Sequence, residues 1–541
     1  MNEKYKIKNT YDTIVVGGGI AGLTATAYLA RSGQRVLLIE KNKECGGLVN
    51  SFIRDGFHFD VGVRALINAG IIFTMLKDLN IKLEVVKSPV SLGIEKEIIH
   101  IKNLDSLLEY RDLLKKFYPE SDNEIDDVIT IIRKIMKHMD VLYGIENPVF
   151  KDLKRDVGFI FKKILPWFPK FIFTVWKINR MNKPVEDYLN TIVKDPSLRD
   201  IITQHFFKNT PSFFALSYFS LYLDYFYPRG GVGKMSEALK SKLLELGGEI
   251  QTETKISGIF PEKHIVKDEQ NIRYKYNNLI WAADLKTLYK ISEIENFSPA
   301  IKTKIKKTKE KMLRNRGGDS IFTLFLEVDE PLESFGKIAH GHFFYTPLRK
   351  GLGETHREEL DKLLSNFSQV NKNQVLAWLE KFTTLNTYEI SIPGLKDAQL
   401  VPKGKTGVII SCLAEYDLFK QIQLAGWLDE FTSELENRIL RVLSESIYPM
   451  LKEKVMARFS FTPLNIESRI GSSEGAITGW AFQASMPVIN NILISNHSVL
   501  TPIPSVFQAG QWTYSPAGVP MSILTGKLAA DKIIKARKSL F

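Results

Sequence analysis

The feature that most constrains the fold is a strand–turn–helix–strand pattern near the N-terminus. The apolar run 13–16 precedes three consecutive glycines, and an alanine-rich helical stretch follows to about Gly33. The glycines are spaced as Gly17-x-Gly19-x-x-Gly22. In this spacing the first glycine makes a tight turn, the second lets backbone N–H groups approach a pyrophosphate, and the third lets helix and strand pack closely. The pattern predicts a βαβ unit that binds a dinucleotide.

An acidic residue closes this unit. The second apolar run, 35–39, ends in Glu40, which lies 18 residues after Gly22. A carboxylate at this place accepts hydrogen bonds from the ribose hydroxyls of an adenine dinucleotide. A glycine motif alone is weak, but strand, glycines, helix, strand and acid in this order disfavour a chance glycine turn.

Length and cysteine usage set further bounds. A chain of 541 residues is long enough for two or three domains and a large buried core. Its two cysteines, Cys45 and Cys412, lie far apart, which argues against a disulfide framework and fits a reducing cytosol. No apolar segment precedes the first strand, so the sequence predicts no secretory signal and a cytoplasmic location.

The net charge of +12 is concentrated in one place. Residues 151–183 hold nine basic and two acidic side chains, and seven aromatic residues are interleaved with lysines within 157–178. The lysines and the prolines Pro166 and Pro169 disfavour a spanning helix, so we expect a segment that lies on a membrane. The alternative is an amphipathic lid packed on a substrate domain. No zinc spacing or RNA-binding aromatic signature is present, so nucleic acid is not an expected partner.

Two later segments complete the nucleotide fold. Gly230 and Gly231 lead into an amphipathic helix that ends at Gly247–Gly248, and a strand pair follows. Near the C-terminus a short strand, a Gly/Pro turn at 517–520 and a final helix follow one another. The nucleotide fold is therefore expected to be assembled from three separated pieces.

Together these motifs have a family resemblance. The segments CGGLVNSF (45–52), FDVG (59–62), YPRGGVGKMSEAL (227–239) and AGQWTYSPAGVPMSILTGKLAA (509–530) resemble the FAD-dependent superfamily of carotenoid desaturases, carotenoid isomerases and retinol saturases, which is related to the flavin amine oxidases. The resemblance implies an α/β fold: a Rossmann-like FAD-binding domain in discontinuous segments, an inserted α+β substrate domain, and a helical subdomain that is the candidate for membrane contact. The implied segments are 10–68, 227–290 and 501–541 for FAD binding, 69–226 for the helical lid, and 291–500 for the substrate-binding sheet.

The resemblance also implies a cofactor site. It places the FAD pyrophosphate on the first glycine loop, the adenosine ribose at Glu40, the adenine beside Ile256, and the flavin near the start of the last helix, whose positive end points toward it. The implied cofactor-binding residues are Gly17, Gly19, Ala21, Gly22, Glu40, Lys41, Gly46, Gly47, Ile256, Gly510, Gly518 and Val519. Cys45 departs from the family pattern, in which proline or a polar residue is usual at this position. Leu48 also departs from it, because arginine is usual there.

No side chain can be assigned a catalytic role from spacing, which suits a reaction in which flavin does the redox step. His340 and His342 have no third ligand at a metal spacing, so we expect an ordinary sheet surface and no metal site. A covalent flavin link at Cys45 is conceivable, but a buried packing thiol is favoured. Trp512 and Tyr514 either shape a substrate tunnel or pack the final helix.

The resemblance implies an oxidoreductase that acts on carbon–carbon bonds of an apolar polyene or isoprenoid. The sequence does not separate desaturase, saturase and isomerase. Two alternatives from other classes remain: a flavin amine oxidase, and a non-enzymatic prenyl or lipid chaperone of the same fold. The intact glycines and Glu40 disfavour the chaperone.

Overall fold

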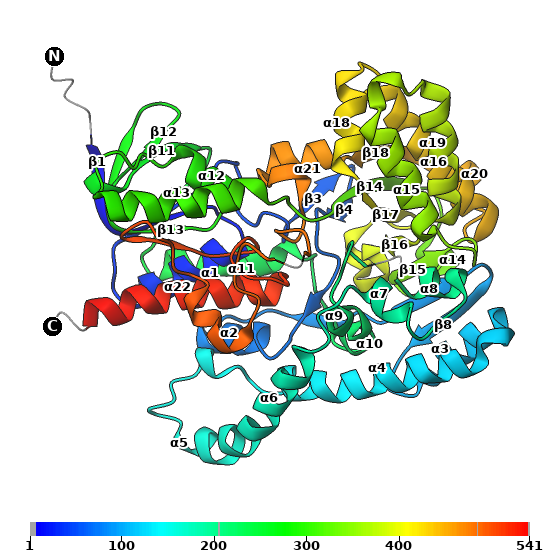
Figure 1. Cartoon of the computed structure of the whole chain (residues 1–541), viewed down its shortest axis with the longest axis horizontal. Coiled ribbons are helices and arrows are strands. Elements are labelled where there is room, and N and C mark those ends of the chain that lie inside the picture. The colour runs from blue at the N-terminus through cyan, green and yellow to red at the C-terminus, as the bar shows by residue number, and fades with distance from the viewer. Residues whose placement is uncertain (1–6, 204–205, 484, 539–541) are drawn as a thin grey trace.

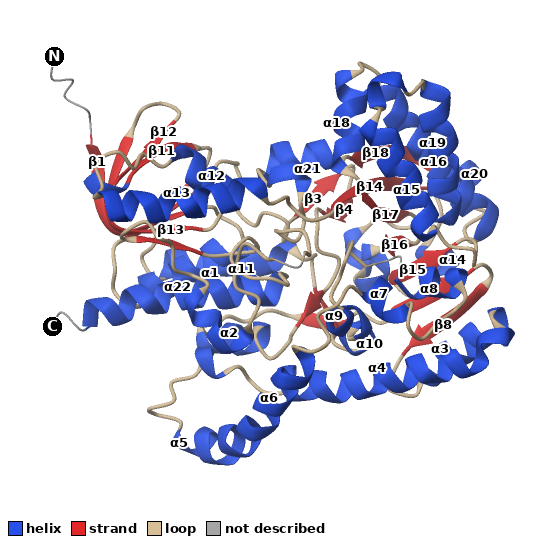
Figure 2. Ribbon diagram, in the orientation of Figure 1, coloured by secondary structure: helices blue, strands red, loops and turns tan. Residues whose placement is uncertain are grey.

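The computed structural model describes residues 7–203, 206–483 and 485–538. Figures 1 and 2 show two sheet layers side by side, with helices around each and a helical layer along one edge.

The first layer is a seven-stranded sheet built from three distant parts of the chain. Its order is β10-β2-β1-β13-β12-β11, and β19 also pairs with β13. The strands β10, β2, β1, β13 and β19 pair in parallel, whereas β12 is antiparallel to both of its neighbours, β11 and β13. The bounds are β1 Ile7–Val16, β2 Val36–Ile39, β10 Glu249–Gln251, β11 Ile256–Phe260, β12 Ile265–Asp268, β13 Arg273–Trp281 and β19 Val506–Gln508.

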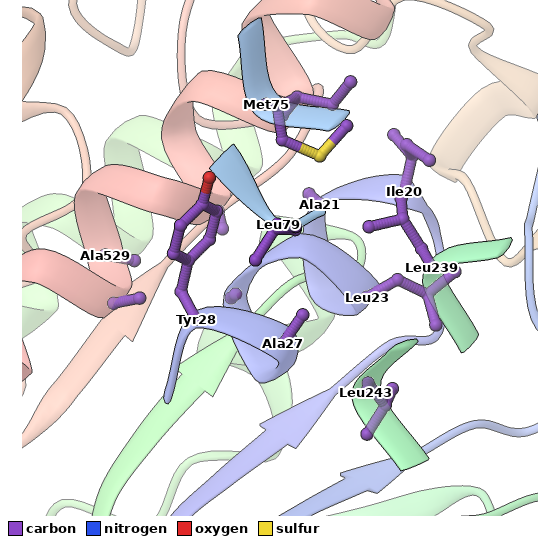
Figure 3. Packing of buried hydrophobic residues seen from close by; sticks show 14 of the residues in the cluster. Ile20, Ala21, Leu23, Ala27, Tyr28, Met75, Leu79, Leu239, Leu243 and Ala529 are labelled. Carbon is purple, nitrogen blue, oxygen red and sulfur yellow. The ribbon is translucent and has the colours of Figure 1, made fainter. Parts of the chain in front are cut away.

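Helices cover both faces of this sheet because its central strands are apolar on both sides. On β1, Val15 belongs to one core cluster, while Ile14 and Val16 belong to the opposite one. Figure 3 shows side chains of the first cluster, among them Leu23, Leu239 and Ala529. This face carries α1 Ile20–Arg31, α2 Ile72–Asp78, α11 Gly233–Glu245 and α22 Val519–Lys538; the other carries α12 Leu285–Ile291 and α13 Pro299–Arg314.

The second sheet also has seven strands, in the order β18-β14-β17-β16-β15-β7-β8. Its bounds are β7 Val90–Ile94, β8 Glu97–Ile101, β14 Ser320–Val328, β15 His342–Thr346, β16 Tyr388–Ser391, β17 Thr406–Ala414 and β18 Val455–Phe461. Helices α14 Leu332–Gly336, α15 Gly353–Ser365, α16 Lys372–Leu385, α17 Pro393–Lys396, α18 Tyr416–Leu424, α19 Leu428–Ser446, α20 Leu451–Lys454 and α21 Pro463–Ile470 accompany it. The strands β7 and β8 lie within 69–226, so this sheet extends beyond the segment 291–500 to which the sequence assigned it.

The helical edge is built mainly from residues 106–222. Its bounds are α3 Ser106–Phe117, α4 Asp122–Tyr143, α5 Val157–Phe159, a π-helical stretch Ile160–Ile164, α6 Leu165–Ile178, α7 Val185–Leu189, α8 Pro196–Thr203, α9 Ser212–Leu216 and α10 Tyr218–Tyr222. Two small sheets join the layers, β3 Ser51–Arg54 with β4 Phe57–Asp60, and β5 Leu66–Ile67 with β6 Val85–Lys87 and β9 Tyr225–Pro228. The architecture confirms the predicted α/β fold with a Rossmann-like layer and an additional sheet domain.

Candidate functional site

The glycine loop between β1 and α1 has one side that packs and one side that is open. Gly17 has a φ of +107°, and a Cβ there would lie 2.6 Å from the carbonyl oxygen of Ala282. A Cβ on Gly22 would overlap the carbonyl oxygen of Gly17. A Cβ on Gly19, by contrast, meets no atom of the described chain within 4 Å. Gly17 and Gly22 therefore serve packing, and Gly19 leaves space for a ligand at the start of α1.

Glu40 is fixed next to this loop by backbone donors. Its Oε2 accepts a hydrogen bond from Gly18 N at 2.7 Å, and its Oε1 accepts one from Asn42 N at 2.8 Å. The side chain is 8% exposed and lines the cavity described below. Each carboxylate oxygen can accept a second hydrogen bond, so Glu40 is oriented and still able to hold hydroxyl groups.

A cavity of about 420 Å³ runs along the open side of the loop. It is lined by residues of all three parts of the dinucleotide layer and by a few from the second sheet domain, such as Ile321 and Ile466. Eleven of the twelve cofactor-binding residues implied by the resemblance line it: Gly17, Gly19, Ala21, Glu40, Lys41, Gly46, Gly47, Ile256, Gly510, Gly518 and Val519. The twelfth, Gly22, does not line the cavity and packs against the carbonyl group of Gly17.

Two further glycine segments border the cavity closely. Gly46 N donates a hydrogen bond to Gly18 O at 2.8 Å, and a Cβ on Gly47 would lie 3.6 Å from the Cα of Gly19. Gly510 N donates to Thr525 Oγ1 of α22 at 3.0 Å. The first residue of α22, Val519, lines the cavity, so the positive end of this 20-residue helix borders it.

Lys41 and Ile256 also line the cavity. Lys41 Nζ donates to the backbone oxygen of Ser468 at 2.9 Å, and burial lowers the pKa of this amine. Ile256 is the first residue of β11 and is buried. A glycine loop, two helix N-termini, an oriented carboxylate and an apolar wall together fit a dinucleotide.

Cys45 packs under the loop. It is buried, and its Sγ would lie 2.9 Å from a Cβ on Gly18. Burial raises the pKa of the thiol to about 11, so the thiolate needed for a nucleophilic link is disfavoured near neutral pH.

Trp512 lines the cavity, and its backbone oxygen accepts a hydrogen bond from Trp480 Nε1 at 2.8 Å. Tyr514 is buried.

A charge network of buried and half-buried side chains adjoins the cavity. Arg64, which lines it, donates through Nη1 to the backbone oxygen of Asp60 and through Nη2 to Ser411 Oγ at 3.2 Å. Lys396 Nζ donates to the backbone oxygen of Arg64 and to Ser391 Oγ, each at 2.8 Å. Burial lowers the pKa of Lys396 to about 8, although the charges of Asp60 and Glu389 oppose the shift.

Glu389 and His342 form the far side of this network. His342 Nε2 lies 3.0 Å from Glu389 Oε1, and burial lowers the pKa of the imidazole. Burial opposes ionisation of Glu389, but the contact with His342 and the charges of Arg64 and Lys396 outweigh it and lower its pKa. The expectation of a sheet-surface histidine is therefore wrong for His342, which is 2% exposed. His340 instead packs against His100, with ring centroids 4.5 Å apart.

No sequence signal pointed to this network. Its members come from β4, the loop after it, β15, β16 and α17, and no short motif contains two of them except Asp60 and Arg64. These polar residues are spread over more than 300 positions of the chain. They come together only when the second sheet packs against the dinucleotide layer.

Comparisons with known proteins agree with this geometry. Residues 15–79 match the model of an NAD(P)-binding Rossmann-like domain. The chain is 20% identical to an all-trans-retinol 13,14-reductase of Danio rerio, over 94% of this chain and 83% of that protein. It is 21% identical to a 4,4'-diapophytoene desaturase (4,4'-diaponeurosporene-forming) of Staphylococcus aureus (strain MRSA252), over 96% and 98% of the two chains.

Solved structures share the fold at lower identity. Putrescine oxidase bound to putrescine superposes with a TM-score of 0.58 at 13% identity, over 97% of this chain and 99% of that one. Cyclohexylamine oxidase of Brevibacterium oxydans does so with a TM-score of 0.56 at 11% identity, over 98% and 99%. The chain is a distant full-length homologue of retinol 13,14-reductase and diapophytoene desaturase, as its motifs predicted, and it has the fold of the flavin amine oxidases.

Proposed function

We propose that the protein is an FAD-dependent oxidoreductase that acts on carbon–carbon bonds of an apolar polyene or isoprenoid chain. The observation that carries this proposal is similarity along nearly the whole chain to proteins named as a retinol 13,14-reductase and a diapophytoene desaturase. The two names specify opposite directions of redox change. The similarity therefore supports the reaction class and leaves desaturase, saturase and isomerase as variants of it.

The cavity supports FAD as the cofactor. The loop Gly17–Gly22 would hold the pyrophosphate, Glu40 the ribose, and Lys41 and Ile256 the adenine side. Gly46, Gly47, Gly510, Gly518 and Val519 would border the flavin end. When bound, FAD supplies hydride transfer to or from a carbon centre.

The protein's own side chains would bind and orient the substrate, exclude water and hold protons. Removal of a hydride from one carbon in a desaturation leaves a proton to be removed from its neighbour. Lys396 is suited to hold a proton near the cavity, because its pKa of about 8 lies near neutral pH. It is hydrogen-bonded to the backbone of Arg64, which lines the cavity.

We also propose that the protein is cytoplasmic and contacts a membrane peripherally through residues 157–178. An apolar polyene would be dissolved in a lipid bilayer, so contact with a membrane would bring the enzyme to its substrate. No helix of the described ranges is long and apolar enough to cross a bilayer.

The test is anaerobic incubation of purified protein with phytoene, lycopene isomers, retinol and amines, in separate samples. We expect a yellow protein with a flavin spectrum, and loss of that spectrum or product formation with at least one polyene. A sample with chemically reduced flavin tests the opposite direction and isomerisation. Bleaching by an amine but by no polyene would support the amine oxidase, and a colourless protein that does not take up FAD would support the lipid chaperone.

A further inference from the structure

A helical rod projects from the edge of the molecule (Figure 1). It comprises residues 157–178, which form α5, the π-helical stretch and α6. One end is fixed to the dinucleotide layer, where Asn147 N donates to Gly70 O at 2.8 Å and Phe150 contacts Tyr28. The other end is fixed to the helical edge, where Ser212 N donates to Lys183 O at 2.8 Å. The chain is thus fixed to the protein on both sides of the rod.

One face of the rod packs on α4. Thr174 and Val175 are buried, and Thr174 Oγ1 lies 3.1 Å from His138 Nδ1. Trp167 Nε1 donates to the backbone oxygen of Val141 at 2.6 Å. The contacts that attach the rod to the protein are therefore made by this face.

A second face carries an apolar stripe that nothing in the described chain covers. Its exposed fractions run from 40% for Ile172 to 65% for Phe161. Successive members are three or four residues apart, so they lie along one side of a helix. The stripe consists of Val157, Phe161, Leu165, Phe168, Ile172 and Trp176, with Phe173 beside it.

Cations accompany the stripe. Lys162, Lys163 and Lys170 are exposed, and no acidic side chain in the described ranges pairs with them. The guanidinium carbon of Arg180 lies 3.6 Å from the ring centroid of Trp176, and Lys177 Nζ lies 5.3 Å from it. Lysine and arginine near exposed tryptophan and phenylalanine are typical of helices that lie at the level of lipid headgroups.

We propose that the rod docks on an anionic lipid bilayer, with the stripe inserted to the boundary between headgroups and acyl chains and the lysines at the phosphates. This deepens the proposed function by naming its membrane partner and the side chains that bind it. The charge decides between a membrane and a second copy of the chain. Residues 151–183 carry nine basic and two acidic side chains, so two copies joined through this patch would repel each other, whereas an anionic surface attracts it.

The test is flotation of the FAD-loaded protein with vesicles of phosphatidylcholine alone and with added phosphatidylserine. We expect binding to the anionic vesicles, weakened about tenfold or more between about 0.05 M and about 0.5 M NaCl because surface charges are screened. F161S/F168S should weaken binding to anionic vesicles about tenfold or more by removing inserted area. K162E/K163E should abolish the preference for anionic over neutral vesicles.

Two matched variants control for loss of any exposed apolar or basic residue. L424S removes the 71% exposed Leu424 of α18, and K306E/K307E reverses two exposed lysines of the basic helix α13. Both should bind vesicles as the wild type does. Equal losses in rod and control variants, or wild-type binding by the rod variants, would overturn the proposal.

Other outcomes separate the rival occupant and the proposed function. Size-exclusion chromatography without lipid should show the same oligomeric state for wild type and F161S/F168S, and a dimer lost in the variant would assign the stripe to a second copy. Flavin content and turnover of detergent-dispersed substrate should be equal in wild type and rod variants. If the purified protein takes up no added FAD but still binds the anionic vesicles, the cofactor proposal is refuted and the docking proposal remains supported.

Discussion

Alanine at two neighbouring glycines should separate folding from cofactor binding. In G22A the new Cβ overlaps the carbonyl oxygen of Gly17, so α1 must move away from β1. Overpacking of this kind costs about 1–3 kcal/mol in the free energy of unfolding. In G19A the Cβ enters open space, and Gly19 has a φ of −69° and a ψ of 178°, which alanine adopts without strain. We expect the free energy of unfolding of the G19A apoprotein to stay within about 0.5 kcal/mol of the wild type.

The loss of FAD affinity should be larger in G19A than in G22A, the opposite order to the loss of stability. The Cβ of G19A occupies space that the cradle leaves beside a pyrophosphate, so the affinity for FAD should fall by about 100-fold or more, since about 1.4 kcal/mol accounts for each factor of ten. Urea unfolding of the apoproteins gives the first quantity, and titration of apoprotein with FAD, followed by flavin fluorescence, gives the second. Wild-type FAD affinity in a folded G19A protein would refute the placement of the pyrophosphate on this loop.

Three other substitutions test the site. E40Q replaces an acceptor oxygen with an NH₂ group that faces a backbone N–H, so urea unfolding should show a loss of about 1–3 kcal/mol, whereas E44Q at an exposed neighbour should show little change. C45A should keep its flavin, and denaturation of wild type should release all flavin into the supernatant, because the thiol of Cys45 is held protonated; flavin retained on the denatured chain would contradict this. Lys396 has a folded-state pKa of about 8 against an ordinary value of 10.5. Between these pH values the unfolded chain keeps a proton that the folded chain has lost, so this residue makes stability rise with pH by up to about 1.4 kcal/mol per unit, and it adds no slope below about pH 8. The difference in unfolding free energy between wild type and K396M should show that slope, and parallel curves for the two proteins would refute the assignment.

The dinucleotide layer was predictable because its signals are local. Gly17, Gly19 and Gly22 lie within six residues, and each is required by a contact or an approach that the βαβ geometry alone dictates. Glu40 follows at the end of the next strand. The later pieces around Gly230 and Gly518 carry similarly short motifs, so their joint presence indicates a layer made of three segments.

The second sheet and the charge network could not be read in this way. The strands β7 and β8 join that sheet through β15, some 250 residues further along the chain, and nothing in their own sequence specifies that partner. Lys396, Glu389 and His342 look like ordinary polar residues of a mixed segment. Their chemistry comes from burial beside Arg64, a property of tertiary packing.

The segment 157–178 lies between these cases. Its composition predicts an amphipathic helix with many aromatic residues, but composition does not tell which of them the protein buries. Trp167 and Trp176 are both flanked by apolar residues and lysines. The indole N–H of Trp167 nevertheless donates to a backbone oxygen of α4, whereas Trp176 is 46% exposed. The lid interpretation fits the face of Trp167, and the membrane interpretation fits the face of Trp176. Brominated lipid should quench tryptophan fluorescence in the wild type and in W167F but not in W176F. This result would show that the two faces have these separate roles.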